Sequence, residues 1–260
     1  MVSSRTIATT AIFTAFTAAV TLSIAVYIPA TKGYFDVGEV MVYITAMLMG
    51  PRIGAFAGGV GSAISDAILA PVYAPGTLVI KGTEGFIVGY LTKRNPAGLS
   101  RRGWRVTGAL LGVVLGLIVA WIGVAYLSGD KTIYLGLSYC SANCTTIQSQ
   151  VYTDIGPQFS ASFFVPAALW IIVGAAAFAF VTLVTLRMEE RVGWTILAIL
   201  LAGSEMVLGY FLYESLALQL GFVTASVEVP VNIGQVLVGL IVSVPVVRSY
   251  RRIAVRTSLS

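Results

Sequence analysis

Residues 38–70 read GEVMVYITAMLMGPRIGAFAGGVGSAISDAILA, two apolar runs on either side of the tripeptide Gly50-Pro51-Arg52. Glycine followed by proline marks a turn, so we predict one helix over about 38–50 and another over about 53–71. The second helix is long enough to cross a bilayer. The first, at about 1.5 Å per residue, spans only about 20 Å, so we expect it to begin at depth. The stretch therefore predicts successive membrane helices.

The rest of the chain has the same character. Of its 260 residues 57% are hydrophobic and only 10% are charged, whereas about a quarter of a soluble domain is charged. The first apolar run is too long for a signal peptide, so we expect a retained helix there. The runs predict eight spans, at about 6–28, 38–50, 53–71, 76–92, 104–127, 161–186, 194–218 and 230–248. The predicted fold class is all-α, a polytopic transmembrane helix bundle in the cell membrane.

The basic residues indicate the orientation of this bundle. Of sixteen lysines and arginines, only Lys32 and Lys131 lie in the connections predicted to be external, and Lys81 lies within a span. The remaining thirteen lie in or beside alternate connections: Arg5, Arg52, Lys93, Arg94, Arg101, Arg102, Arg105, Arg187, Arg191, Arg248, Arg251, Arg252 and Arg256. This positive-inside pattern places both termini in the cytoplasm. Because the net charge of +5 follows from topology, we predict contact with membrane lipid and no nucleic-acid partner.

Several kinds of chemistry lack the residues that they need. The sequence contains no histidine and no G-x-x-x-x-G-K-[ST] motif, so it offers neither a Cys/His metal site nor an ATP site of its own. Carboxylates without a nucleophile–base pair do not define a hydrolytic site. We therefore predict no enzyme activity, no bound metal and no cofactor.

The two cysteines lie four residues apart in a polar loop over about 128–160, on the predicted external side. In that oxidising setting a disulfide between Cys140 and Cys144 is the preferred interpretation. Two free thiols are the alternative, because such a pair is bridged only where the backbone bends suitably.

Small residues recur at four-residue spacing on three of the predicted spans. Such stripes let helix backbones approach each other in lipid. They are Gly54 and Gly58; Gly108, Gly112 and Gly116; and Ala11, Ala15 and Ala19. Each stripe fits either packing within the bundle or docking of a partner, and the spacing leaves both open.

Five charged residues fall well inside predicted spans: Asp66, Lys81, Glu84, Glu205 and Glu214. Glu39 and Glu228 lie close to the predicted outer ends of spans. A charge at mid-bilayer costs about 2.5–3.5 kcal/mol, so each one needs a reason. All except Glu205 fall in the outer half of the bundle, which indicates a polar cavity that faces outside. Because Glu205 and Glu214 lie on opposite faces of one helix, we assign Glu205 to packing or assembly and Glu214 to the cavity.

The polar residues of the outer half predict a ligand site. Lys81 and Glu84 share a helix face at i,i+3 spacing and form either an internal ion pair or two walls of this site. Asn232 and Gln235 have the same spacing on the last span. The predicted substrate-binding residues are Asp66, Lys81, Glu84, Tyr213, Glu214, Asn232 and Gln235. With aromatic neighbours, such a set suits a small polar heterocycle.

A resemblance to a known family is carried by four stretches: FDVGEVMVYITAMLMGPRIGAFAGGVGSAISD (35–66), YAPGTLVIKGTEGFIVGYL (73–91), LAGSEMVLGYFLYES (201–215) and EVPVNIGQVLVGLIVSVP (228–245). They are similar to helices of the substrate-binding S components of energy-coupling factor (ECF) vitamin transporters. The resemblance covers roughly residues 6–92 and 194–248.

This resemblance implies a six-helix core with an external vitamin site, capped by the loop Pro29 to Val37. Riboflavin, a thiamine-like compound or a pyridoxine-like compound would be the ligand. The resemblance also implies that Ala11, Ala15 and Ala19 meet a transmembrane T subunit, and that two cytoplasmic ATPase subunits power uptake.

The predicted domain organisation departs from that family. Residues 1–92 and 193–260 correspond to its core, and residues 93–192 insert two spans with the cysteine loop. The predicted function is the substrate-capture subunit of an ECF-type importer. One alternative is an accessory or structural subunit of a larger membrane complex without solute transport. A second is a stand-alone secondary transporter that uses carboxylates as proton sites.

Overall fold

The computed structural model describes residues 3–94, 101–135, 159–187 and 190–257. The chain divides into two compact units, a core unit comprising Met1–Leu110 and Val181–Ser260 and a second unit comprising Leu111–Phe180. Cys140 and Cys144 lie outside the described residues, so their disulfide stays a prediction.

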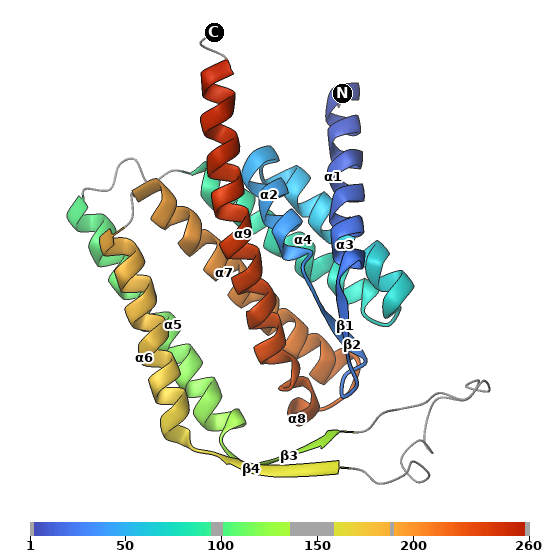
Figure 1. Cartoon of the computed structure of the whole chain (residues 1–260), viewed down its shortest axis with the longest axis vertical. Coiled ribbons are helices and arrows are strands. Elements are labelled where there is room, and N and C mark those ends of the chain that lie inside the picture. The colour runs from blue at the N-terminus through green and yellow to red at the C-terminus, as the bar shows by residue number, and fades with distance from the viewer. Residues whose placement is uncertain (1–2, 95–100, 136–158, 188–189, 258–260) are drawn as a thin grey trace. The chain divides into compact units, whose positions relative to one another are not determined.

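The core unit is a bundle of helices with a β-hairpin at one end (Figure 1). Within it, α3 packs against α1 and α4, α4 against α7, and α2 against α9. Its elements are α1 (Ser4–Ser23), β1 (Ala25–Ile28), β2 (Gly33–Asp36), α2 (Glu39–Met49), α3 (Pro51–Leu69), α4 (Ala74–Lys93), α7 (Glu190–Leu212), the π-helical turn η2 (Tyr213–Ala217), α8 (Phe222–Ala225) and α9 (Glu228–Thr257). The predicted helical bundle is confirmed, with short strands added to it.

The predicted turn at Gly50 is also confirmed, because α2 ends at Met49 and α3 begins at Pro51. Gly50 has a φ of 89°, a conformation that glycine adopts without strain. Proline suits the first helical position because its φ is already helical and its missing N–H needs no partner there. The short helix α2, of 11 residues, begins at Glu39, whose side chain is fully buried.

The predicted first helix is wrong at its C-terminal end. We expected a helix to about residue 28, but α1 ends at Ser23, and β1 pairs antiparallel with β2 from Ala25↔Asp36 to Ile28↔Gly33. Val26, Tyr27 and Ile28 extend the apolar run, yet β-branched and aromatic side chains favour extended backbone. The prediction was based on hydropathy, which reports that residues 25–28 are apolar but not that they form a strand.

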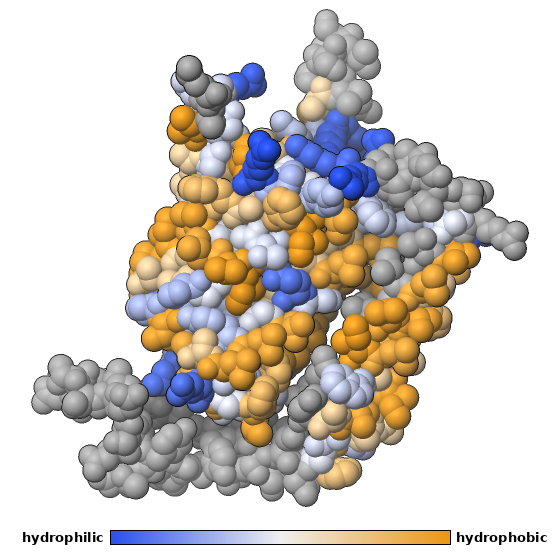
Figure 2. All heavy atoms as spheres, turned by 180° about the vertical axis from the view of Figure 1, so that it is seen from behind, coloured by the Kyte–Doolittle hydropathy of each residue, from blue (hydrophilic) through white to orange (hydrophobic). Residues whose placement is uncertain are grey.

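The core unit carries apolar side chains outside and charges inside. Phe16, Ile68 and Val79 are more than half exposed, whereas Glu39 and Glu84 are fully buried. Figure 2 shows hydrophobic side chains over much of the visible face, with hydrophilic ones gathered near the end at which Figure 1 marks both termini. This arrangement reverses that of a soluble protein and suits a lipid surround.

Four helical stretches of the described chain are long and apolar enough to cross a membrane: Ser4–Ser23, Gly103–Ala125, Arg191–Ala217 and Phe222–Ala254. The helices α3 and α4, of 19 and 20 residues, are not among them. The protein is therefore a helical membrane protein, and the count of eight spans stays a prediction.

The second unit is reached through α5 (Arg101–Ile122). It continues through the π-helical turn η1 (Gly123–Leu127), the antiparallel strands β3 (Gly129–Leu135) and β4 (Phe159–Val165), and α6 (Ala167–Arg187). Gly116 of the predicted stripe contacts α6, since a Cβ there would lie 2.6 Å from the carbonyl oxygen of Gly174. That residues 93–192 are an insertion stays a prediction.

Glycines bring α3 and α4 into close contact. A Cβ at Gly58 would lie 2.9 Å from the carbonyl oxygen of Lys81, and one at Gly54 would lie 2.9 Å from that of Gly85. Such an approach increases van der Waals contact between helices in lipid. This stripe therefore packs within the bundle, and it determines where Lys81 lies relative to α3.

The variant Gly85→Ala is expected to destabilise the core unit by about 1–3 kcal/mol, the usual cost of overpacking. The new Cβ would lie 2.7 Å from the carbonyl carbon of Gly54. Gly82→Ala is the matched control on the same helix, because its Cβ would come no closer than 3.5 Å to the neighbouring described atoms. Thermal unfolding in detergent measures both variants, and equal unfolding temperatures would contradict the expectation.

Candidate functional site

A pocket lies between β2 and the helices α3, α4, α7 and α9. The empty space within it, open solvent at the mouth included, is about 310 Å³. The lining residues are Gly33, Tyr34, Asp36, Asp66, Tyr73, Lys81, Tyr210, Glu228, Asn232 and Gln235. Segments far apart in the sequence therefore build the pocket together. Four of the predicted site residues lie in its lining: Asp66, Lys81, Asn232 and Gln235.

The β1–β2 hairpin is attached to this pocket by polar contacts. Thr31 donates a hydrogen bond to Glu228 of α9, and the Tyr34 hydroxyl donates to Asp66 of α3. The Tyr73 hydroxyl donates to the backbone carbonyl of Thr31 at 2.9 Å. Burial and the neighbouring carboxylate of Asp66 raise the pKa of the Tyr34 phenol, so Tyr34 keeps the proton that it donates.

Asp36 anchors the hairpin through both of its carboxylate oxygens. One accepts from the backbone N–H of Gly38 at 2.6 Å, and the other accepts from the side-chain amide of Gln235 at 2.9 Å. Burial raises the pKa of the Asp36 carboxyl, whereas the nearby Lys81 and the two donors act in the opposite direction. Through the bond to Gln235, Asp36 ties the end of β2 to α9.

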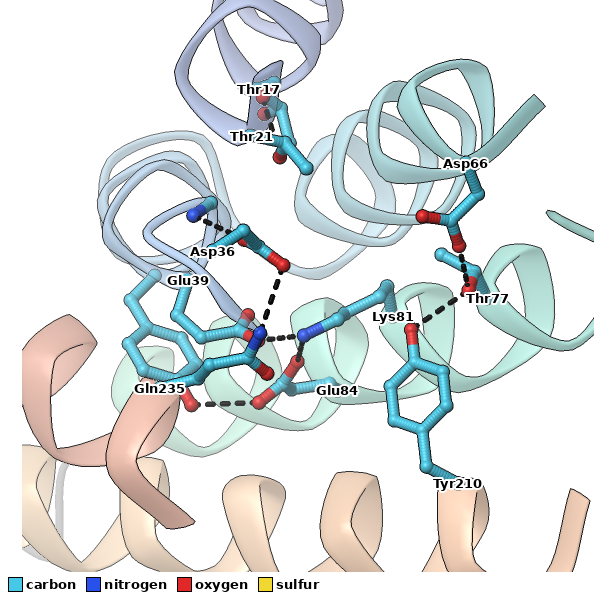
Figure 3. Close-up of polar contacts among 12 residues, drawn as sticks. Thr17, Thr21, Asp36, Glu39, Asp66, Thr77, Lys81, Glu84, Tyr210 and Gln235 are labelled. Carbon is cyan, nitrogen blue, oxygen red and sulfur yellow. Dashed lines mark hydrogen bonds and ion pairs between the residues drawn. The ribbon is translucent and has the colours of Figure 1, made fainter. Parts of the chain in front are cut away.

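Lys81 lies at the centre of a buried ionic cluster (Figure 3). Its ammonium forms an ion pair with Glu39 of α2 and lies 3.7 Å from the carboxylate of Glu84. Glu84 in turn accepts from the Tyr43 hydroxyl at 2.7 Å. The predicted closeness of Lys81 and Glu84 is therefore confirmed, but only Lys81 lines the pocket.

Glu39 is the partner that sequence reasoning missed. Its position suggested a place near the outer end of a span. Glu39 is instead the first residue of α2 and is fully buried within the bundle, where it pairs with Lys81 of α4. The short length of α2 was the available signal for this burial.

A second polar group is built around Asp66 (Figure 3). Asp66 accepts from the Thr77 hydroxyl of α4, and Thr77 shares a hydrogen bond of 2.8 Å with the Tyr210 hydroxyl of α7. The Lys81 ammonium lies 5.5 Å from the centre of the Tyr210 ring, within the range of a cation–π interaction. Tyr210 therefore connects the Asp66 group to the Lys81 cluster.

Three predicted site residues lie outside the pocket lining. Glu84 lies 3.7 Å from the Lys81 ammonium but does not line the pocket. Tyr213 donates to the backbone carbonyl of Val72 at 2.8 Å. Glu214 is fully buried in η2, close enough to Glu228 and Tyr73 to interact with them. Their part in binding stays a prediction.

Six lining residues were not among the predicted site residues: Gly33, Tyr34, Asp36, Tyr73, Tyr210 and Glu228. Gly33, Tyr34 and Asp36 belong to a hairpin that the apolar pattern did not reveal, and the others flank helix ends. A partial signal was available, since Tyr34 and Asp36 lie in the loop Pro29 to Val37 that the family resemblance placed over the site.

Asn232 differs from its neighbours in the pocket. Its side chain is only 4% exposed, and no hydrogen bond to its amide is found among the described residues. A buried polar group normally has a partner. Asn232 therefore presents to the pocket an amide that has no hydrogen-bond partner within the described chain.

The alanine stripe of α1 faces away from the bundle. Ala11, Ala15 and Ala19 are exposed, whereas Thr14 and Thr17 are buried. On the buried side, a Cβ at Gly61 of α3 would lie 2.7 Å from the Cβ of Thr17. The threonines thus make the internal contact of α1, and the alanines leave a flat, small-residue face uncovered.

Comparisons with known proteins agree with this architecture. Residues 1–156, more than half of the chain, match the family described as "ECF-type riboflavin transporter, S component". A protein from Pyrococcus woesei, described as "Uncharacterized protein in gap 3'region", is 43% identical over 106 residues, which make up 41% of this chain and 68% of that protein.

Proposed function

The chain belongs to the S-component family of ECF-type transporters, and on that premise we propose that it captures a small vitamin-like ligand outside the cell. The family is one of transporters rather than of enzymes. The observation that carries the proposal is the pocket, in which buried polar side chains from five segments meet and Asn232 has no partner within the described chain. An unsatisfied amide in a cavity is suited to a ligand that completes its hydrogen bonds.

The proposed orientation places the pocket on the outside of the cell membrane. The hairpin follows the C-terminal end of α1, and Glu228 begins α9. Both features therefore lie at the end of the core unit opposite the chain termini (Figure 1). The basic residues favour cytoplasmic termini, which leaves the hairpin and the pocket facing outward in an eight-span, multi-pass protein.

The proposed partners are a transmembrane T subunit and two ATPase subunits. The chain has no G-x-x-x-x-G-K-[ST] motif with which to use ATP itself, so in this proposal other subunits supply the energy for uptake. The exposed face of Ala11, Ala15 and Ala19 supports docking, because small residues let a partner helix approach closely in lipid.

Ala15→Trp is expected to prevent assembly with a co-expressed T subunit and its ATPases while ligand binding is kept. The bulky ring would stand between the two helix backbones and remove their close contact. Ala67→Trp, at an exposed alanine of α3, is the matched control. Co-purification of the complex measures assembly, and unchanged recovery of partners with Ala15→Trp would contradict docking at this face.

Asn232→Ala is expected to weaken ligand binding by about 1–3 kcal/mol, the usual effect of removing one partner of a buried hydrogen bond. The protein is purified in mild detergent and denatured, and the released small molecules are identified by mass spectrometry. Ser204→Ala, at an exposed hydroxyl of α7, is the control and should keep the ligand.

A stoichiometric vitamin-like compound that is reduced in Asn232→Ala would support capture. A preparation that releases no ligand, and whose unfolding temperature is unchanged across a panel of vitamins, would contradict it. That result would favour the structural-subunit alternative, in which the buried polar residues only satisfy one another.

A further inference from the structure

The core of the protein has a large excess of buried negative groups. Lys81 is the one basic side chain classed as buried among the described residues. The buried carboxyls are Asp36, Glu39, Asp66, Glu84, Glu214 and Glu228. A carboxylate in a low-dielectric interior is costly unless it is paired with a positive group, so the pairing of these groups has to be accounted for.

The charge of Lys81 is already shared among several carboxylates. Its ammonium is paired with Glu39, lies 3.7 Å from Glu84 and interacts electrostatically with Asp36. Lys81 therefore cannot also neutralise the carboxyls on the other wall of the pocket.

Asp66 and Glu228 are left on that wall with neutral partners. Asp66 accepts hydrogen bonds from Tyr34 and Thr77, and Glu228 accepts one from Thr31. Within the described chain neither carboxyl forms a salt bridge. Hydroxyl donors bind a carboxylate but do not cancel its charge, so this wall still favours a cation.

The two carboxyls act on the same space. Both line the pocket, and Glu228 lies close enough to Asp66 to interact with it electrostatically. Glu214 lies beside Glu228, and a proton shared between those two would still leave negative charge on the pair and on Asp66. Like charges held together in a cavity attract a positive ligand.

The other walls fit an organic cation better than a metal ion. No three metal-ligating side chains converge as a metal site would require, as far as the described residues extend. Tyr34, Tyr73 and Tyr210 are among the lining residues, and the ammonium of Lys81 lies 5.5 Å from the centre of the Tyr210 ring. Aromatic faces stabilise organic cations, and the unpaired amide of Asn232 offers a carbonyl oxygen to an N–H group.

We propose that the ligand captured by this pocket is a small organic cation whose positive group lies between Asp66 and Glu228. This inference rests on the proposed capture function and names the chemical class of its ligand. Asp66 and Glu228 supply the negative charge, the tyrosine rings cover the faces of the ligand, and Asn232 binds a polar group at its edge. A neutral isoalloxazine such as that of riboflavin would leave the two carboxyls uncompensated.

A matched pair of probes tests the charge requirement. Pyridoxamine carries an ammonium group where pyridoxine carries a hydroxyl, and thiamine and riboflavin extend the comparison to a permanent cation and a neutral ring. Dissociation constants are measured by calorimetry at pH 7 with the full chain in detergent. We expect at least one of the two cations to bind about tenfold or more tightly than the neutral probes, since one charge-assisted contact contributes about that factor. The small molecule released on denaturation should likewise carry positive charge at pH 7.

Two variants connect that preference to the carboxyls. Asp66→Asn and Glu228→Gln keep the size of each side chain and remove its charge, and each is expected to weaken cation binding about tenfold while leaving binding of neutral probes within about twofold. Glu205→Gln, at a half-buried carboxyl of α7 outside the pocket, is the control. Unfolding temperatures within a few degrees of the unaltered protein would show that the variants are folded.

The outcomes separate this inference from the function on which it rests. Tight binding of riboflavin or pyridoxine, unaffected by either variant, would overturn the cation and leave capture intact. A neutral or anionic released ligand would do the same. Binding of none of the four probes, together with no released ligand, would overturn both. Cation binding that Asp66→Asn and Glu228→Gln leave unchanged would overturn the assignment of the site.

Discussion

Lys81→Met is expected to lower the free energy of unfolding by about 3–5 kcal/mol, the range found when one partner of a buried ion pair is removed. Methionine preserves most of the length of the side chain but leaves Glu39 and Glu84 without a positive group. Both carboxyls are fully buried, so neither can regain water without opening the bundle. Ligand binding should be lost as well, because Lys81 forms one wall of the pocket. Thermal or denaturant unfolding in detergent measures the first effect and calorimetry the second.

A second substitution distinguishes unpaired charge from lost packing. If uncompensated charge causes the instability, Lys81→Met combined with Glu39→Gln should recover about half of the loss or more, because pairs in contact are not additive. Lys32→Met, at an exposed lysine in the turn of the β1–β2 hairpin, is the control and should change stability by less than about 0.5 kcal/mol. A double variant no more stable than Lys81→Met would contradict the role assigned to the cluster.

Asp36→Ala is expected to remove one attachment of the hairpin to α9 and to weaken ligand binding by about 3 kcal/mol, or roughly a hundredfold. This figure combines two hydrogen bonds at the upper end of the usual contribution of about 0.5–1.5 kcal/mol each. The bonds are those from Gly38 and Gln235. Asp36 lies at the end of β2, whose residues Gly33 and Tyr34 also line the pocket, so its loss should loosen that whole wall.

Hydrogen exchange measured on peptides of residues 25–36 checks this mechanism directly. We expect faster exchange in the hairpin of Asp36→Ala, while exchange in α3 and α4 stays slow. Asp36→Asn keeps an acceptor oxygen for Gly38 and should have a smaller effect on both exchange and affinity. Hairpin exchange at the rate of the unaltered protein, despite weakened binding, would show that Asp36 acts on the ligand rather than on the hairpin.

Local sequence signals predicted the helical part of the fold. The apolar runs indicated membrane helices, and Gly50-Pro51 marked the break between α2 and α3 at the residue where it occurs. Gly54 and Gly58 predicted a close helix contact that the structure contains between α3 and α4. These properties depend on residues within one or two turns of each other, which is why a single sequence reveals them.

The same signals failed where conformation and hydropathy diverge. Residues 25–28 are as apolar as a helix in lipid, yet they form β1, because pairing with β2 satisfies their backbone groups. The pairing partner, β2, follows a turn, and no periodic pattern of apolar residues predicts that turn or the pairing. An error at the end of the first helix therefore concealed the hairpin that forms one side of the pocket.

The sequence by itself determined that this chain is a helical membrane protein of the S-component family, with charges that need a reason to be buried. It also indicated Asp66, Lys81, Asn232 and Gln235 as members of one site. Only the tertiary structure decided which groups meet, as the pairs Glu39–Lys81, Tyr34–Asp66, Thr31–Glu228 and Asp36–Gln235 show. Helical spacing places residues on a face, but the approach of one backbone to another decides which face lies opposite. The cost of an unpaired buried charge then selects the partner from the side chains that this packing brings within reach.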